Sequence, residues 1–292
     1  MVYAKLDWFS GMFYNTSISE IMEKLGIYNE LYDEMLSSLY ERSQGFNSVA
    51  VFSLNGVSFE VRWDDYLSTE KTAIFERVFS KIRLDISGSG LDYLRSTGFK
   101  VDKVFTDRTF FGEYGTDYTV TRCDFAYDFV NYKSDFLDNV LYWIKDMERT
   151  SGYIQGDYRL HTGRGSGLQY SYRCGSHQKT LYLGSPRADK LVRIYDKYLE
   201  QTQNGVFIHG VPEAFQKNES DDIKSWFRIE FQSRRKCADN FLYSCDGDIR
   251  NVLRVIFEQY LIRDEKGIPL PCMVDLYDWE KLPPIIINSN FI

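Results

Sequence analysis

The stretch Val120-Thr-Arg-Cys-Asp-Phe-Ala-Tyr-Asp-Phe-Val130 alternates between apolar and ionisable side chains, which is typical of a half-buried β-strand. Successive side chains of a strand point to opposite faces of the sheet. One face would carry Cys123, Phe125, Tyr127 and Phe129, and the other Arg122, Asp124 and Asp128. The stretch therefore predicts a sheet with one apolar face, to be covered by helices, and one polar face.

Three other segments repeat this alternation and are expected to be strands, at 81–90, 191–197 and 225–233. Their polar faces would carry Arg83, Asp85 and Ser87; Arg193, Tyr195 and Lys197; and Arg228, Glu230, Gln232 and Arg234. If the four strands share one sheet, its polar face gathers Asp124, Asp128, Glu230 and Tyr195 among several cations. The solvated face of an ordinary antiparallel sheet would show the same alternation, so both interpretations stay open.

Helices and turns are expected around these strands. Ser17 and Glu20 form a capping-box pattern for a short helix that runs through Leu25 and is stopped by Gly26. The pair Asn55-Gly56 predicts a β-hairpin from 48–54 and 57–63. Further helices are expected at 68–79, 134–149 and 248–262, more strands between 153 and 198, and a long loop at 200–222. The expected fold class is α+β, an antiparallel or mixed central β-sheet with one polar catalytic face, covered by helices.

The length and composition indicate a globular, unexported protein. A chain of 292 residues can form one large domain or two modest ones. We expect an N-terminal region at 1–80 and a catalytic region at 81–292, with one continuous domain as the alternative. No apolar run approaches the roughly 18 residues that span a bilayer, and the N-terminus lacks a signal-peptide pattern. A soluble, cytoplasmic protein without membrane contact is expected.

The cysteines and charges narrow the function classes. Five cysteines without a Cys-x-x-Cys pair, with three scattered histidines, indicate neither a disulfide framework nor a zinc site. A net charge of −7 argues against a protein that coats nucleic acid non-specifically, since lysine and arginine supply phosphate binding. A local basic groove is still compatible, because cations concentrate at 159–193 and at Arg228, Arg234, Arg235 and Lys236. A solvated charged face is the alternative interpretation.

The residue types on the polar face suit phosphoryl transfer. Clustered carboxylates without histidine or cysteine favour a hard divalent cation such as Mg²⁺, Mn²⁺ or Ca²⁺. Tyrosine, with an ordinary pKa of about 10, becomes a nucleophile at neutral pH only when cations or a metal favour its phenolate. Arg193 and Lys197 would favour the phenolate of Tyr195 and bind the phosphate. The chain has 22 tyrosines, however, and a packing role is the ordinary one.

Several segments resemble, in order and spacing, the replication initiation factor family of rolling-circle plasmid and phage initiators and related relaxases of conjugative elements. They are Ile86-Ser-Gly-Ser-Gly-Leu-Asp-Tyr-Leu94, Thr121-Arg-Cys-Asp-Phe-Ala-Tyr-Asp128, Thr180-Leu-Tyr-Leu-Gly-Ser185 with Leu191-Val-Arg-Ile-Tyr-Asp-Lys197, and Trp226-Phe-Arg-Ile-Glu-Phe-Gln-Ser233. The resemblance covers roughly residues 80 to 235. The first segment departs from the pattern at Ser89, where many relatives have glutamine, and at Leu91, where relatives have cysteine or another residue.

The resemblance implies a nicking-closing enzyme that lacks the His-hydrophobic-His motif. It implies Tyr195 as the nucleophile, with a 5′-phosphotyrosine intermediate, and Asp124, Asp128 and Glu230 as ligands of Mg²⁺ or Mn²⁺. The implied partners are single-stranded or hairpin origin DNA and a host helicase, and a homodimer is one oligomeric state left open. A metal nuclease that uses water and a DNA-binding module without catalysis are the two alternatives. The origin and its plasmid, phage or conjugative context are not indicated.

Overall fold

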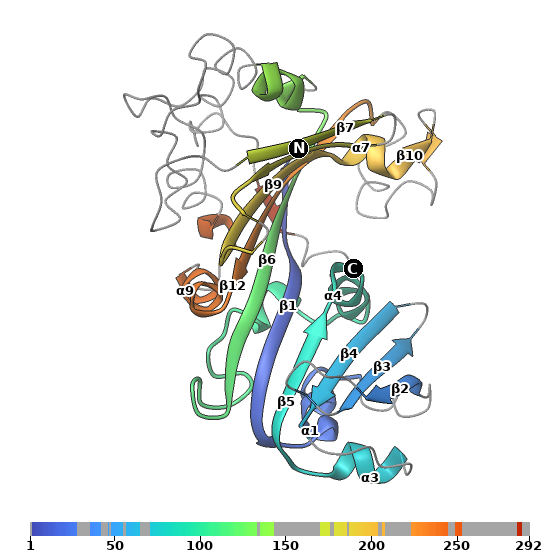
Figure 1. Cartoon of the computed structure of the whole chain (residues 1–292), viewed down its shortest axis with the longest axis vertical. Helices are drawn as coiled ribbons and strands as arrows, with labels where there is room; N and C mark the ends of the chain where they lie inside the picture. The colour runs from blue at the N-terminus through green and yellow to red at the C-terminus, as the bar shows by residue number, and fades with distance from the viewer. Residues whose placement is uncertain are drawn as a thin grey trace. The chain divides into compact units, whose positions relative to one another are not determined.

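The computed structural model shows an α+β protein, as expected (Figure 1). It describes residues 2–27, 36–41, 46, 48–54, 57–64, 71–132, 135–142, 170–175, 178–185, 187–203, 206–207, 223–244, 249–252 and 285–287. The chain forms two compact units. Unit 1 comprises Met1–Lys5, Phe125–Ser233 and Ile249–Asn288, and unit 2 comprises Leu6–Asp124, Arg234–Asp248 and Ser289–Ile292. Whether residues 1–80 form a domain of their own stays a prediction.

Unit 2 is built on a sheet with the strand order β2-β3-β4-β5-β1-β6. Its strands are β2 (Leu36–Glu41), β3 (Ser48–Leu54), β4 (Val57–Trp63), β5 (Phe79–Ile86), β1 (Val2–Thr16) and the first part of β6 (Tyr118–Val130). The hairpin predicted from Asn55-Gly56 is confirmed, because β3 and β4 pair antiparallel from Leu54↔Val57 onward. Apolar residues at alternate positions of β5 are buried as expected, with Ile82, Leu84 and Ile86 in the core.

Five helices belong to unit 2, in the part of the chain that the structure describes. They are α1 (Ile18–Lys24), α3 (Lys71–Glu76), α4 (Gly88–Ser96), α5 (Val101–Val104) and α9 (Lys236–Ser244). Helix α1 has the predicted capping box, in which Ser17 Oγ accepts from the Glu20 amide and the Glu20 side chain accepts from the Ser17 amide. Phe9, Phe105 and Phe111 pack together in the aromatic core of this unit.

Several expected element boundaries are wrong in unit 2. The strand expected at 81–90 ends at Ile86, and Ser87 caps α4 by accepting from the Gly90 amide. A side chain at Gly90 would approach Ile86 Cγ2 to 2.8 Å, so glycine is needed where the helix meets the strand. The helix expected at 68–79 is α3, and Phe79 already begins β5. Helix α9 was not expected from the sequence.

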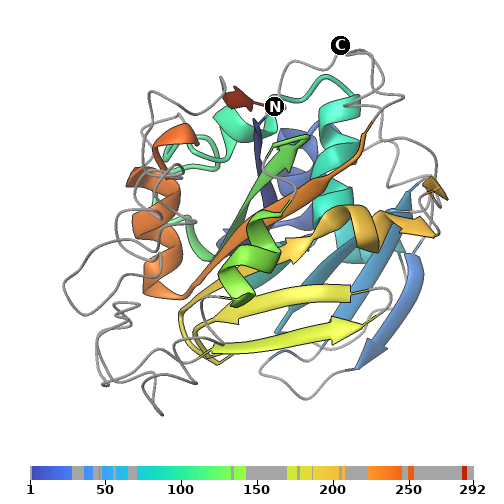
Figure 2. The same cartoon turned by 90° about the horizontal axis from the view of Figure 1, so that it is seen from above.

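Unit 1 is built on strands in the order β6-β12-β9-β8-β7. They are the second part of β6, β12 (Trp226–Arg234), β9 (Lys190–Asp196), β8 (Gln178–Leu183) and β7 (Tyr170–Gly175). Figure 2 shows β7, β8 and β9 side by side, in agreement with their antiparallel pairing. The first residues of β1 pair in parallel with β13 (Ile285–Ile287), so the pairing is mixed. On the apolar face Phe129 stacks on Phe227, with ring centroids 4.6 Å apart.

The remaining expectations for unit 1 are met in part. Residues 136–142 and 250–252 are helical, and the rest of the helices expected at 134–149 and 248–262 lies outside the described residues. Part of the expected loop at 200–222 is instead the end of α7 (Lys197–Gln201) and the short pair β10 (Thr202–Gln203) and β11 (Val206–Phe207). No helix in the described ranges is long and apolar enough to cross a membrane.

Candidate active site

The pairing of β9 with β12 brings four of the polar residues into one block. Tyr195 lies opposite Arg228, and Arg193 lies opposite Glu230. Directly opposite residues of an antiparallel pair share a face, with Cβ atoms about 5 Å apart. On the other side of β9, Thr180 of β8 is the register partner of Tyr195. The expectation that Arg193, Tyr195, Arg228 and Glu230 share one sheet face is therefore confirmed.

Glu230 connects the tyrosine with an arginine. Its carboxylate is buried, at 3% exposure. The Tyr195 hydroxyl donates to Glu230 Oε2 at 3.3 Å, and the Arg193 guanidinium pairs with Glu230 Oε1. The hydroxyl contact is long for an O–H···O bond, whose usual length is near 2.75 Å. Catalytic hydrogen bonds are often this loose before the substrate binds. Glu230 is thus placed to accept the phenolic proton.

Arg228 is held rigidly beside the tyrosine. Its Nε donates to Asp128 Oδ1 at 2.7 Å and its Nη2 to Asp128 Oδ2 at 2.8 Å. Trp226 Nε1 also donates to Asp128 Oδ1, at 2.7 Å. Arg228 and Asp128 are 5% and 4% exposed, and such a two-pronged charged contact fixes the plane of a guanidinium. The sequence placed Arg228 on the polar face but did not reveal its partners, which come from a separate strand.

Lys197 reaches the tyrosine by a different route from the expected one. Strand β9 ends at Asp196, whose Oδ1 accepts from the Leu199 amide, and Lys197 begins helix α7. The expectation that strand alternation places Lys197 is therefore wrong. Its ammonium nevertheless lies 5.5 Å from the centroid of the Tyr195 ring, and it pairs with Glu200. Burial, and secondly the charge of Arg228, lower the pKa of Lys197.

The three carboxylates predicted as metal ligands are each bound to an arginine. Asp124 belongs to unit 2 and accepts from Arg122 Nε at 3.0 Å, whereas Asp128 and Glu230 belong to unit 1. Asp124 and Asp128 are four residues apart on β6, about 13 Å along an extended strand. Metal–oxygen distances are about 2.0–2.6 Å, which is too short for both to ligate one ion. Among the described residues no three His, Cys, Asp or Glu side chains group so as to hold a metal. The arrangement does not fit one ion, and the metal requirement stays a prediction.

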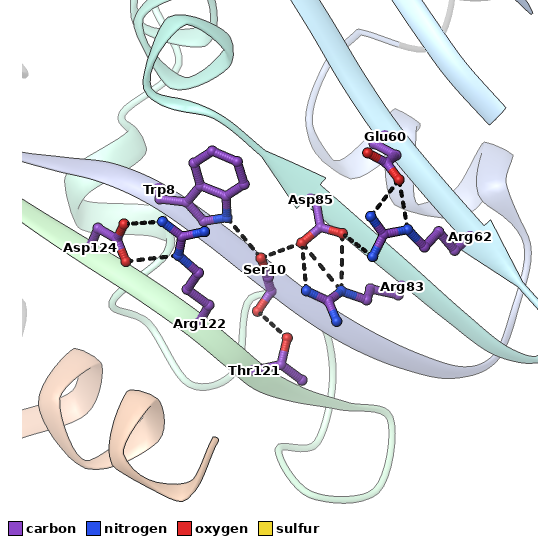
Figure 3. A network of polar contacts seen from close by, with 9 residues as sticks. All are labelled: Trp8, Ser10, Glu60, Arg62, Arg83, Asp85, Thr121, Arg122 and Asp124. Atoms are coloured by element: carbon purple, nitrogen blue, oxygen red, sulfur yellow. Dashed lines mark hydrogen bonds and ion pairs between the residues drawn. The ribbon is translucent and has the colours of Figure 1, made fainter. Parts of the chain in front are cut away.

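A second polar network lies in unit 2 (Figure 3). Asp85 of β5 accepts from Ser10 Oγ at 2.5 Å and from Arg83 Nε and Nη2 at 3.0 Å. Arg62 Nη1 lies 3.3 Å from Asp85 Oδ2. In the same figure Arg122, which binds Asp124, lies over the ring of Trp8, 4.1 Å from its centroid. Arg83 and Arg122 thus have fixed orientations.

A cationic groove of about 730 Å³ lies beside this network in unit 2. It is lined by Arg83, Thr119, Val120, Thr121, Arg122, Arg234, Arg235, Lys236 and Asp239. Arg235 has a left-handed backbone, with φ 54°, and its amide donates to the Thr121 carbonyl at 2.8 Å. This bond ties the start of α9 to β6. The sequence showed the run of cations at 234–236 but not the turn that directs it.

Comparisons with known proteins support the fold. No family model matches the chain, and no curated protein matches its sequence. A solved structure of a rolling circle replication initiator protein from Geobacillus stearothermophilus matches with a TM-score of 0.59 and 18% sequence identity. The match covers 92% of each chain. At this identity the likeness shows a shared fold.

Proposed function

We propose that the protein initiates rolling-circle DNA replication by cutting and rejoining one strand at an origin, with Tyr195 as the nucleophile. The observation that carries the proposal is the position of the Tyr195 hydroxyl. It donates to the buried carboxylate of Glu230, opposite Arg228 and with the Lys197 ammonium over its ring. A proton acceptor and two cations are what a phenol needs to attack a phosphodiester. The initiator fold of the solved structure and the family resemblance support the same reaction.

In the proposed reaction, the phenolic oxygen of Tyr195 forms a bond to phosphorus and the bond from phosphorus to the 3′ oxygen breaks. The phenolic proton passes to Glu230, and the departing 3′ oxygen takes a proton to become a hydroxyl. The products are a free 3′ hydroxyl and a 5′-phosphotyrosine. Attack of a 3′ hydroxyl on the phosphotyrosine reverses these steps and closes the strand. Arg228 and Lys197 stabilise the negative charge that develops on the transferred phosphate.

Replacement of Tyr195 by phenylalanine tests the nucleophile. The substrates are 3′-labelled single-stranded oligonucleotides that tile the DNA element encoding the chain, and the products are separated on a denaturing gel. The wild type should form a covalent protein–DNA adduct, which Tyr195→Phe should abolish because phenylalanine has no attacking oxygen. Tyr182→Phe is the matched control, since Tyr182 is the neighbour opposite Arg193, and it should keep the adduct.

Three results of this experiment would contradict the proposal. An adduct that persists in Tyr195→Phe would assign the nucleophile to another residue. Strand cleavage without any adduct in the wild type would favour a nuclease that uses water. Binding without cleavage at any oligonucleotide would favour a DNA-binding module without catalysis.

Metal dependence is a separate part of the proposal, expected from the residue types and the resemblance. Adduct formation should be lost in EDTA and restored by Mg²⁺ or Mn²⁺. Full activity in EDTA would remove the metal from the reaction and leave the cations of the site as the only stabilising charges.

A further inference from the structure

We propose that the cationic groove of unit 2 is a second nucleic-acid site, which binds the phosphodiester backbone of DNA. Its lining comes from β5, β6 and the junction of β12 with α9, all within unit 2, and none of it includes Tyr195. The inference rests on the proposed function in one respect: it takes the polyanion that binds the groove to be DNA. The groove's affinity for a phosphate backbone can be measured without any cutting.

The charge of the groove is opposite to that of the chain. Five cations line it, against one carboxylate, Asp239, whereas the whole chain has a net charge of −7. Arg235 and Lys236 are exposed and Arg234 is half-buried. A cleft lined by one sign of charge concentrates oppositely charged ligands, even on a molecule of the other overall sign. The ligand expected from this charge is a polyanion.

Two of the arginines are oriented in advance. Arg83 and Arg122 each use Nε and Nη2 on a carboxylate of their own strand, Asp85 and Asp124. Their side chains keep 30% and 21% of their surface exposed. Among the described residues, neither Nη1 makes a hydrogen bond. A guanidinium held in this way loses little freedom when its free edge meets a ligand oxygen.

The backbone of Arg235 supplies an independent argument. A φ of 54° is strained for an arginine and natural for glycine or asparagine. Strained residues of this kind cluster at functional sites, where the side chain is needed in one place. Here the turn brings the Arg235 side chain into the lining of the groove. The position therefore favours a role for the cation over a role in folding.

Four of the five cations are arginines, and this favours phosphate over an acidic peptide. The guanidinium is planar and binds two phosphate oxygens at once, and arginine is enriched where nucleic acids are bound. Thr119 adds a hydroxyl group to the lining, as is common at phosphate contacts, whereas the Thr121 hydroxyl already donates to the Ser10 carbonyl. Single-stranded and duplex DNA share the phosphodiester backbone. The slope of affinity against salt concentration differs between them and shows which form occupies the groove.

The test uses the full chain carrying Tyr195→Phe, so that no covalent adduct forms. Arg235→Gly and Arg235→Asn remove the cation at a position where both new residues accept the left-handed backbone. Lys100→Ala removes an exposed cation of the same unit that does not line the groove. Affinities for a labelled single-stranded oligonucleotide and for its duplex are measured by fluorescence anisotropy between 50 and 200 mM salt, alongside a thermal melt of each variant.

Both Arg235 variants should melt no lower than the parent and bind DNA more weakly. The slope of log affinity against log salt should fall by about 0.7 on single-stranded DNA or about 0.9 on duplex, whichever occupies the groove, as expected for one lost phosphate contact. Lys100→Ala should leave the slope unchanged. Unchanged slopes in both Arg235 variants, or equal competition by polyglutamate, would overturn the inference. The adduct assay with unmodified Tyr195 reports the proposed function separately, so either idea can fail alone.

Discussion

At the residue scale, the central contact is that of the Tyr195 hydroxyl with Glu230. The same carboxylate binds Arg193, so it serves both a candidate nucleophile and a candidate phosphate ligand. The residue types on this face were predictable from alternation, because β9 and β12 keep a regular register. Arg122, the partner of Asp124, lies on the same strand and the same predicted face, whereas the partners of Asp128 and Glu230 were not predictable. These partners lie on strands that are distant in the sequence, and the pattern within one segment does not show which strands pair.

Glu230→Gln should slow adduct formation by about 10²- to 10⁴-fold, the usual effect of removing a general base. Glutamine keeps an oxygen that can accept from Tyr195 but cannot take its proton at neutral pH. The rate is measured by single-turnover adduct formation against pH, and the variant should lose the pH dependence that belongs to the base. Asp138→Asn, which alters an exposed carboxylate paired with Lys179, is the control and should behave as wild type. A rate within threefold of wild type would exclude Glu230 as the base.

Asp128→Ala should destabilise the protein by about 3–5 kcal/mol, because it leaves the buried Arg228 guanidinium without its carboxylate. Urea unfolding measures the loss. Asp128→Asn should lose less, since the amide oxygen still accepts from Trp226 or Arg228. The size of the stability loss distinguishes two roles of Asp128, the ion pair with Arg228 and the predicted binding of a metal ion. Normal stability combined with a lost response to Mn²⁺ would instead make Asp128 a metal ligand.

At the element scale, the sequence predicted the strands better than the places where they end. Residues 120–130 and 225–233 were expected as strands and lie within β6 and β12 apart from Ser225, because their alternation continues to the end. Strands β5 and β9 stop earlier than expected, at Ile86 and Asp196. In both cases a side-chain oxygen, of Ser87 or Asp196, accepts from a helix amide. A residue of this kind can either continue the strand or cap a helix, and tertiary packing decides which of the two conformations forms.

The junction of β9 with α7 gives a prediction about pH. Burial lowers the pKa of Lys197, so its charge opposes folding at neutral pH. The unfolded chain holds this proton more tightly, and stability should therefore rise as the pH passes from the folded pKa toward the ordinary value of about 10.4. Lys197→Met should be more stable than wild type at pH 7, with an advantage that shrinks toward pH 10, and should form the adduct more slowly. Chemical denaturation at the two pH values measures this. A variant less stable at pH 7 would show that the ion pair with Glu200 dominates.

At the scale of the whole molecule, the candidate nucleophile and the cationic groove belong to different units. Substitutions at sites that share no contacts usually have additive effects. Arg235→Gly should therefore raise the KM for adduct formation roughly three- to tenfold, the effect of losing one solvent-exposed hydrogen bond worth about 1 kcal/mol, with kcat unchanged. Steady-state kinetics on the cleaved oligonucleotide measures the two constants. A fall in kcat with an unchanged KM would place Arg235 in the chemical step instead.

The pairing of Val2–Ala4 with Ile285–Ile287 has a consequence for the way the protein is made. Unit 1 uses residues from near both ends of the chain, and unit 2 needs Arg234–Asp248 to complete its contacts. A ribosome adds about 5–20 residues per second, so the first strand waits about 15–60 s for its last partner. During that interval the start of β1 has an unpaired edge open to other nascent chains. The pairing of β1 with β13 is therefore expected to be a late step of folding during synthesis.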